Sequence, residues 1–136
     1  MDSLFLDTSF IIALEDADDQ NHQIAVAYWK AFKRNPRKII TTSYIFDEPA
    51  TFLKRRISHE KAAEVGKLML SSPTVELIHI SEEHFDKSWR LFLKYHDKSF
   101  SFTDCISFLV MEDKGIKKAL TFDEHFRQMG INVQPF

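Results

Sequence analysis

The stretch SFTDCISFLVMEDKGIKKALTFDEHF, residues 101–126, contains the local pattern that decides the fold. Its first half is apolar on nearly every side, which is typical of a buried helix, and we predict that helix over residues 103–114. Gly115 stands where a helix would end, and the run at 118–121 is short and apolar, as in a buried strand. We therefore predict a helix, a tight connection and a strand that stops just before the carboxylate of Asp123.

The same alternation of helix-like and strand-like segments extends along the whole chain. The strands that we predict lie at 4–6, 38–41, 75–80, 118–121 and 132–135. The helices that we predict lie at 9–16, 22–34, 44–56, 59–71, 82–96, 103–114 and 124–129. Strands separated by helices favour a mainly parallel sheet with helices on both faces. We therefore expect an α/β fold with three α/β/α layers and about five strands, in a single domain over residues 1–136.

Composition and charge exclude several classes of function. The formal net charge of the 136 residues is −2, which argues against a broad cationic surface for gripping duplex nucleic acid. The 3 glycines are scattered, so the chain has neither a glycine-rich phosphate loop nor a dinucleotide fingerprint. No G-x-S-x-G motif is present for a hydrolase serine. Carboxylates remain as the main reactive groups.

Cysteine usage and hydropathy indicate a cytoplasmic protein. The single cysteine, Cys105, cannot form an internal disulfide, which suits a reducing compartment. The N-terminus has no basic segment of the signal-peptide kind, and Asp7 interrupts its one apolar run. No stretch approaches the roughly 20 apolar residues that a membrane span needs. We expect a soluble intracellular protein that has no membrane partner.

Four acidic residues occupy positions that solvation alone does not explain. Asp7 and Asp123 directly follow two predicted strands, at the carboxyl edge where parallel sheets form their sites. Glu48 and Asp104 each share a stripe with apolar residues at helical spacing, so both are expected near buried surface. The four carboxylates are therefore candidates for a common site.

Each acid also has an ordinary structural explanation. Asp7 and Asp123 would serve as helix N-caps, and Asp104 would close a capping box with Ser101. Glu48 would lie on the surface, or in the first turn of a helix that begins close to it. These alternatives remain open for each residue taken singly. Together, four neighbouring carboxylates would repel one another and be costly to bury, whereas a divalent cation such as Mg²⁺ or Mn²⁺ would favour their grouping.

At these residues the sequence resembles the PIN-domain nucleases, and among them the toxin ribonucleases of the VapC type. The likeness covers essentially the whole chain and is most specific in residues 101–126, quoted above. The first and second acids stand in the similar segments FLDTSFIIALEDADDQNHQIA and TTSYIFDEPATFLKRR. The resemblance implies that four residues form the acidic site of a metal-dependent nuclease: Asp7, Glu48, Asp104 and Asp123. Pro49 departs from the family pattern, and we expect it to loosen or kink its helix.

The resemblance and the local charge pattern add residues around the acids. Thr8 and Ser9 match the polar pair after the first acid, and Thr121 has the similar place before the fourth, so all three are expected to orient carboxylates. Three basic residues after Glu48 are candidate RNA contacts, with a solvated helix face as the alternative: Lys54, Arg55 and Arg56. Two histidines at places where the family also has histidine are interpreted as packing residues with one hydrogen bond each: His22 and His125.

The function that the resemblance implies is hydrolysis of RNA phosphodiester bonds by water that one or two Mg²⁺ or Mn²⁺ ions activate. Single-stranded or looped RNA is the expected substrate, because proteins reach unpaired bases more readily than a closed A-form groove. The resemblance further implies a homodimer and a cognate antitoxin, one segment of which obstructs the acidic site. The alternative is a catalytically silent PIN-like module that binds RNA or protein.

Overall fold

The structure, a computed structural model, describes residues 2–136. The strands are β1 (Leu4–Leu6), β2 (Ile39–Thr42), β3 (Val75–Ile78), β4 (Lys118–Leu120) and β5 (Asn132–Gln134). The helices are α1 (Thr8–Glu15), α2 (His22–Arg34), α3 (Ser43–Arg56), α4 (His59–Ser71), α5 (Glu82–Lys94), α6 (Phe102–Lys114) and α7 (Glu124–Gln128). Every predicted strand and helix is present, and the boundaries differ from the predicted ones by one or two residues at most.

The strands form one five-stranded sheet in which every neighbouring pair is parallel. The strand order is β3-β2-β1-β4-β5, so the chain builds outward from β1 to one edge and then returns to build β4 and β5 on the other side. The order of connection therefore reverses between β1 and β4. In open parallel sheets, ligands bind beside such a reversal, at the carboxyl ends of the strands.

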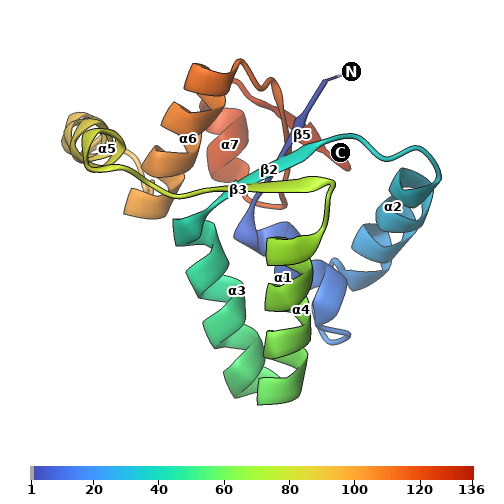
Figure 1. The fold of residues 1–136 in the computed structure, drawn as a ribbon. Coiled ribbons are helices and arrows are strands. Elements are labelled where there is room, and N and C mark those ends of the chain that lie inside the picture. The colour runs from blue at the N-terminus through green and yellow to red at the C-terminus, as the bar shows by residue number, and fades with distance from the viewer. Residues whose placement is uncertain (1) are drawn as a thin grey trace.

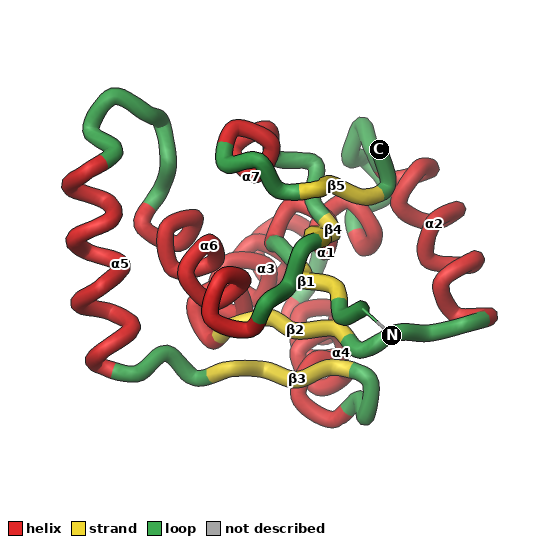
Figure 2. Tube along the Cα trace, turned by 90° about the horizontal axis from the view of Figure 1, so that it is seen from above, coloured by secondary structure: helices red, strands yellow, loops and turns green. Residues whose placement is uncertain are grey.

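Helices cover both faces of this sheet, which confirms the predicted α/β/α layers (Figure 1). In Figure 1, α1, α3 and α4 lie below the sheet and α6 and α7 above it, and Figure 2 shows α5 and α2 at opposite ends of the molecule. Within these layers α2 packs on α1, and α5 packs on α6 at one end of the molecule. Within residues 2–136, no helix combines the length and the apolar character that crossing a membrane would require.

The core fixes the helices that begin at the carboxyl edge of the sheet. Phe5 of β1 and Phe126 of α7 are fully buried and pack with ring centroids 6.4 Å apart. Phe108 of α6 meets Phe126 edge to face at 5.1 Å. Burial of each such ring stabilises the fold by roughly 1.5–3 kcal/mol. The start of α7 is thereby held against both the central strand and α6.

Helix α3 differs from expectation at Pro49. The helix runs from Ser43 to Arg56 without a break, so it does not begin near Pro49. Pro49 is itself buried, in one row with Ile45 and Leu53 at spacings of four residues. Because this row packs into the protein, it holds the helix together where the proline removes one backbone hydrogen bond. Glu48 is therefore exposed at the border of the buried face, and not on an apolar stripe as its spacing suggested.

Candidate active site

Asp7 and Asp123 extend from the carboxyl ends of the two strands that flank the reversal. Strands β1 and β4 pair in parallel with Leu6 opposite Leu120, and the Asp7 N–H donates to the Leu120 carbonyl at 3.1 Å. Each carboxylate also caps a helix: Asp7 accepts the Ser9 N–H at 3.4 Å, and Asp123 accepts the N–H of the residue two positions on at 2.9 Å. Both acids therefore cap helices, as the structural explanation predicted, and both lie at the carboxyl edge of neighbouring strands.

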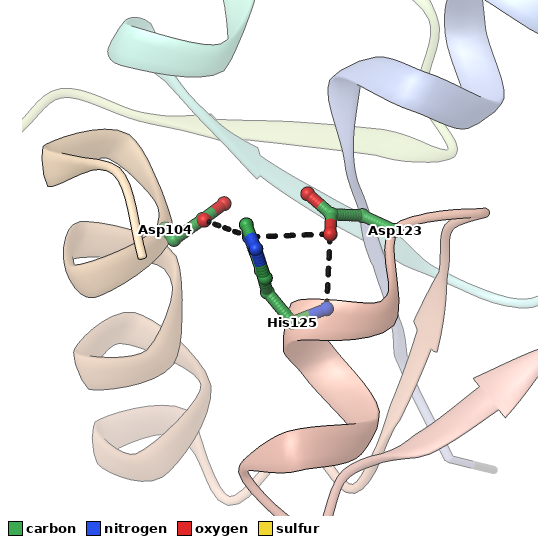
Figure 3. Close-up of side chains that lie close together, drawn as sticks. All are labelled: Asp104, Asp123 and His125. Carbon is green, nitrogen blue, oxygen red and sulfur yellow. Dashed lines mark hydrogen bonds and ion pairs between the residues drawn. The ribbon is translucent and has the colours of Figure 1, made fainter. Parts of the chain in front are cut away.

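Asp104 combines the same two roles at the start of α6. Its carboxylate accepts the Ser101 N–H at 3.0 Å, while the Ser101 hydroxyl accepts the Asp104 N–H at 3.0 Å, which is the predicted capping box. The Asp104 side chain is nearly buried, at 8% exposure, and extends from α6 toward the loop that carries Asp123 (Figure 3). The Asp104 carboxylate thus caps its own helix, α6, and also faces the neighbouring helix α7 (Glu124–Gln128).

His125, in the first turn of α7, lies between these two acids (Figure 3). Its Nδ1 is 2.8 Å from Asp104 Oδ2 and 3.2 Å from Asp123 Oδ1. The ring also packs edge to face on Phe100, with centroids 5.5 Å apart. The interpretation of His125 as a packing residue with one hydrogen bond is therefore incomplete, whereas His22 fits it, with Nδ1 2.8 Å from the Ala13 carbonyl oxygen.

Sequence reasoning had one signal that would have placed His125 in the site. It stands two residues after Asp123, in the first turn of a helix that starts at the sheet edge. A side chain at that position remains within a few ångströms of the N-cap. The distance between His125 and Asp104 could not be predicted from sequence, because it depends on how α6 packs against α7.

Asp7 is the most deeply buried of the acids, at 5% exposure. Its Oδ2 accepts the Thr121 hydroxyl at 2.7 Å and the Ser9 hydroxyl at 2.9 Å. Burial raises the pKa of the Asp7 carboxyl to about 6, although the two hydroxyls lower it and the charges of Asp104 and Asp123 raise it again. Three carboxylates therefore lie close enough to repel one another.

The polar residues expected around Asp7 fall into two groups. The Ser9 hydroxyl also accepts the Phe122 N–H at 2.9 Å, and the Thr121 hydroxyl accepts the Asp123 N–H at 2.9 Å. These two side chains therefore tie the loop after β4 to the carboxylate after β1. The Thr8 hydroxyl is buried but has no hydrogen-bond partner among residues 2–136, so it does not touch Asp7 in this way.

Glu48 stands at the outer border of the cluster. Partial loss of hydration raises the pKa of its carboxyl, although the residue as a whole is exposed. A hydrogen bond with Thr103 lowers that pKa, whereas the charges of Asp104 and Asp123 raise it. The charges of Asp104 and Asp123 therefore act on Glu48 as they act on Asp7. The four predicted acids lie close enough together to interact electrostatically.

The three basic residues at the end of α3 have different surroundings. Arg56 pairs with Asp16 at 3.4 Å and with Asp18 at 3.6 Å, which ties the end of α3 to the end of α1. Lys54 and Arg55 are exposed and line a groove between α3 and α4. Arg55 also lines a second shallow groove together with Glu48. Arg56 lines that second groove as well, so two of the three basic residues share a surface depression with an acid of the site.

The donor atoms of this edge suit a divalent cation. One carboxylate oxygen each from Asp104 and Asp123 and one ring nitrogen of His125 all lie within 4.8 Å of one another. Carboxylate oxygens are the ligands that Mg²⁺ and Mn²⁺ prefer, and imidazole nitrogen is accepted by many transition metals. Burial is the main cause of the raised pKa values of Asp7 and Glu48, and a cation would relieve the repulsion from Asp104 and Asp123 that adds to it. The residues present therefore fit a metal-binding site.

Comparisons with known proteins identify the family of the chain. Residues 4–132 match the family model described as the PIN domain. The chain is 32% identical over 133 residues to the 23S rRNA-specific endonuclease VapC20 of Mycobacterium tuberculosis, and the match covers 97% of this chain and 98% of that one. The crystal structure of VapC20, described as a Sarcin-Ricin loop cleaving toxin, superposes with a TM-score of 0.85 at 30% identity over 94% of this chain and 95% of that chain.

Two more distant structures share the fold. VapBC2 from Rickettsia felis, bound to a DNA fragment from its promoter, has a TM-score of 0.68 at 12% identity and covers 97% of both chains. FitAcB from Neisseria gonorrhoeae has a TM-score of 0.65 at 14% identity and covers 96% of this chain and 95% of that chain. At these identities the likeness concerns the fold alone.

Proposed function

Because the chain belongs to the PIN-domain family, we propose that it is a metal-dependent endoribonuclease that hydrolyses RNA phosphodiester bonds and acts as the toxin of a toxin–antitoxin pair. The observation that carries this proposal is that four acids from separate parts of the chain lie close enough for the charges of two to raise the pKa of the other two: Asp104 and Asp123 act on Asp7 and Glu48. The proposed unit is the single domain formed by residues 1–136. The catalytically silent alternative is disfavoured because none of the four acids is missing.

In this proposal the acids hold Mg²⁺ or Mn²⁺ at the edge of the sheet. Asp104 and Asp123 offer the oxygens that lie closest to one another, and Asp7 offers its Oδ1, since its Oδ2 is taken by hydroxyl donors. When bound, the cation would polarise the phosphate and lower the pKa of a water molecule. Glu48 is exposed at the border of the cluster, and its proposed role is to bind the cation or to accept a hydrogen bond from that water.

The remaining polar side chains hold the carboxylates in position. The Thr121 hydroxyl donates to Asp7 and accepts from the Asp123 backbone, so one side chain fixes the spacing of two acids. Ser9 does the same between Asp7 and the backbone of Phe122. Such contacts orient ligands before the metal arrives, which reduces the cost of ordering them on binding. The predicted orienting role of Thr8 has no hydrogen bond to support it among residues 2–136.

The proposed substrate is a looped, single-stranded RNA segment, and ribosomal RNA is the first to examine, since the 32% identical relative is a 23S rRNA endonuclease. Arg55 and Lys54 are the proposed phosphate contacts because both are exposed on α3, between Glu48 and the C-terminal end of the helix. Arg56 is a weaker candidate, since its guanidinium already pairs with two aspartates. The site of action is proposed to be the cytoplasm.

Two apolar surfaces support the proposed protein partners. A cavity of about 520 Å³ between α1, α2 and α4 is lined by apolar side chains that include Phe10, Leu14 and Trp29, and it would take an antitoxin segment. On α5, Phe85 and Trp89 contact Phe102 of α6 but remain 42% and 48% exposed, and this exposed surface would suit a homodimer contact. Exposed apolar patches of this kind commonly mark protein interfaces.

The function is tested by cleavage of a panel of structured RNAs, ribosomal fragments included, with Mg²⁺, with Mn²⁺ or with a chelator. Cleavage is expected only with a divalent ion, and Asp104→Asn is expected to abolish it. Asp86→Asn, which changes an exposed carboxylate on α5, is the matched control and is expected to cleave normally. Cleavage that persists in both the chelator and the Asp104→Asn protein would contradict the proposal.

A further inference from the structure

We propose that His125 is itself a ligand of the divalent cation, bound through Nδ1 beside Asp104 and Asp123, and that it sets which metal the site prefers. The inference rests on the proposed function in one respect, namely that a cation binds at this sheet edge. It adds a nitrogen ligand to a site for which only carboxylates were expected. The resident ion would then be a transition metal such as Mn²⁺ in preference to Mg²⁺.

The distances around Nδ1 support the assignment. Two ligands at right angles on a cation, each about 2.1–2.2 Å from it, lie about 3 Å apart. Nδ1 is 2.8 Å from Asp104 Oδ2 and 3.2 Å from Asp123 Oδ1, which brackets that value. Figure 3 shows the ring nitrogen directed at both carboxylates from the start of α7. Both distances from the nitrogen therefore match the spacing of neighbouring ligands on one cation, and the donor atoms of the three residues lie within 4.8 Å of one another.

The ring is also held so that it cannot easily leave this position. Phe100, which is buried, packs edge to face on the imidazole at 5.5 Å. The His125 backbone N–H donates to Asp123 Oδ1 at 2.9 Å, so the residue and one of its proposed co-ligands are fixed to each other. The His125 side chain is 25% exposed, which leaves one side open for a cation to enter. Both ring and carboxylate are thus arranged before binding.

A second histidine in the same chain provides a comparison. His84 Nε2 lies 2.6 Å from Asp113 Oδ2, so it too pairs with a carboxylate. That pair lies outside the group of residues whose donor atoms converge within residues 2–136, and the Asp113 side chain is 50% exposed. His84 therefore shows the pairing that is expected of a histidine with one acidic neighbour. His125 differs because two acids share its nitrogen.

Ligand chemistry gives the functional consequence. Mg²⁺ strongly prefers oxygen and keeps much of its water, whereas imidazole nitrogen binds well to later divalent ions. A site with two carboxylates and one imidazole should therefore bind Mn²⁺ more tightly than Mg²⁺. Replacing the imidazole with an amide should lower the Mn²⁺ affinity by roughly tenfold or more, and should change the Mg²⁺ affinity less.

The test is electron spin-echo spectroscopy of the Mn²⁺-loaded full-length protein, which detects nitrogen nuclei coupled to the ion. Wild-type protein is prepared with ordinary histidine and with ¹⁵N-labelled histidine. If a histidine binds the ion, the ¹⁴N modulation of the first sample is replaced by ¹⁵N modulation in the second. His125→Gln is expected to lose the coupling and His84→Gln to keep it, and Mn²⁺ and Mg²⁺ affinities are measured by calorimetry on the same proteins.

The outcomes separate this inference from the proposed function. Mn²⁺ that binds without histidine coupling in the wild-type protein would overturn the ligand role of His125, while the metal-dependent nuclease would stand. Coupling that survives in His125→Gln would assign the nitrogen to another histidine and would overturn the inference equally. If no Mn²⁺ binds, both this inference and the proposed metal site fail. Because the wild-type labelling decides the first question, a variant that folds poorly does not remove the test.

Discussion

Asp7→Asn should stabilise the metal-free protein, and the gain should depend on pH. Asn keeps the shape of the side chain and remains a good N-cap, so the bond from the Ser9 N–H can persist. What the substitution removes is a charge. In the folded protein, burial and the charges of Asp104 and Asp123 raise the pKa of the Asp7 carboxyl to about 6, compared with 3.8 ordinarily.

The size of the effect follows from that difference. A carboxyl whose pKa is higher in the folded state binds its proton more tightly there, so the stability it contributes is complete below pH 3.8 and is lost as pH rises through about 6. The interval of about 2.2 pH units, at about 1.36 kcal/mol per unit, amounts to about 3 kcal/mol. The free energy of unfolding of Asp7→Asn, minus that of the wild type, should therefore grow by up to about 3 kcal/mol between pH 4 and pH 7.

The assay is urea denaturation with a chelator present, at half-unit steps from pH 4 to pH 8, for wild type, Asp7→Asn and the control Asp86→Asn. Comparing differences between proteins removes the pH dependence of all other groups. The control changes an exposed carboxylate and should give a flat difference. A flat or falling difference for Asp7→Asn would refute the argument that an ionised Asp7 is destabilising in the absence of a cation.

Three further predictions concern the site and the groove beside it. Asp104→Asn should lower RNA cleavage by more than about 100-fold. Calorimetry should also show that this variant loses most of the rise in melting temperature that Mn²⁺ gives the wild type, and an unchanged rise would contradict a ligand role for Asp104. Thr121→Val should lower the free energy of unfolding by about 1–3 kcal/mol in a urea titration, because the partly buried Asp123 N–H and the buried Asp7 Oδ2 both lose a partner. Thr51→Val, at an exposed site, should leave that free energy unchanged. Arg55→Ala should weaken RNA binding and reduce its dependence on salt in a fluorescence titration, and unchanged salt dependence would dispose of the proposed phosphate contact.

Much of the fold follows from local features of the chain. Periodicity and capping act within a few residues, so several features can be recognised from the sequence. They are the buried helix α6, the left-handed Gly115 that ends it, with φ 67°, the apolar run of β4 and the acid that follows. The same holds for the capping box of Ser101 and Asp104, which the structure confirms. Parallel pairing then brings the acids after β1 and β4 to one edge, since all carboxyl ends share that edge.

The tertiary structure decided what depends on the rotation and packing of whole helices. Pro49 proved to lie on the buried face of α3 and Glu48 beside it, because the packing of α3 in its layer determines which face is covered. Arg56 is tied to Asp16 of the neighbouring segment, a contact between residues 40 positions apart in sequence. His125 meets Asp104 only because α6 and α7 pack side by side. Sequence spacing measures distance along one helix or strand, whereas these contacts join elements whose relative placement is determined by the packing of the whole core.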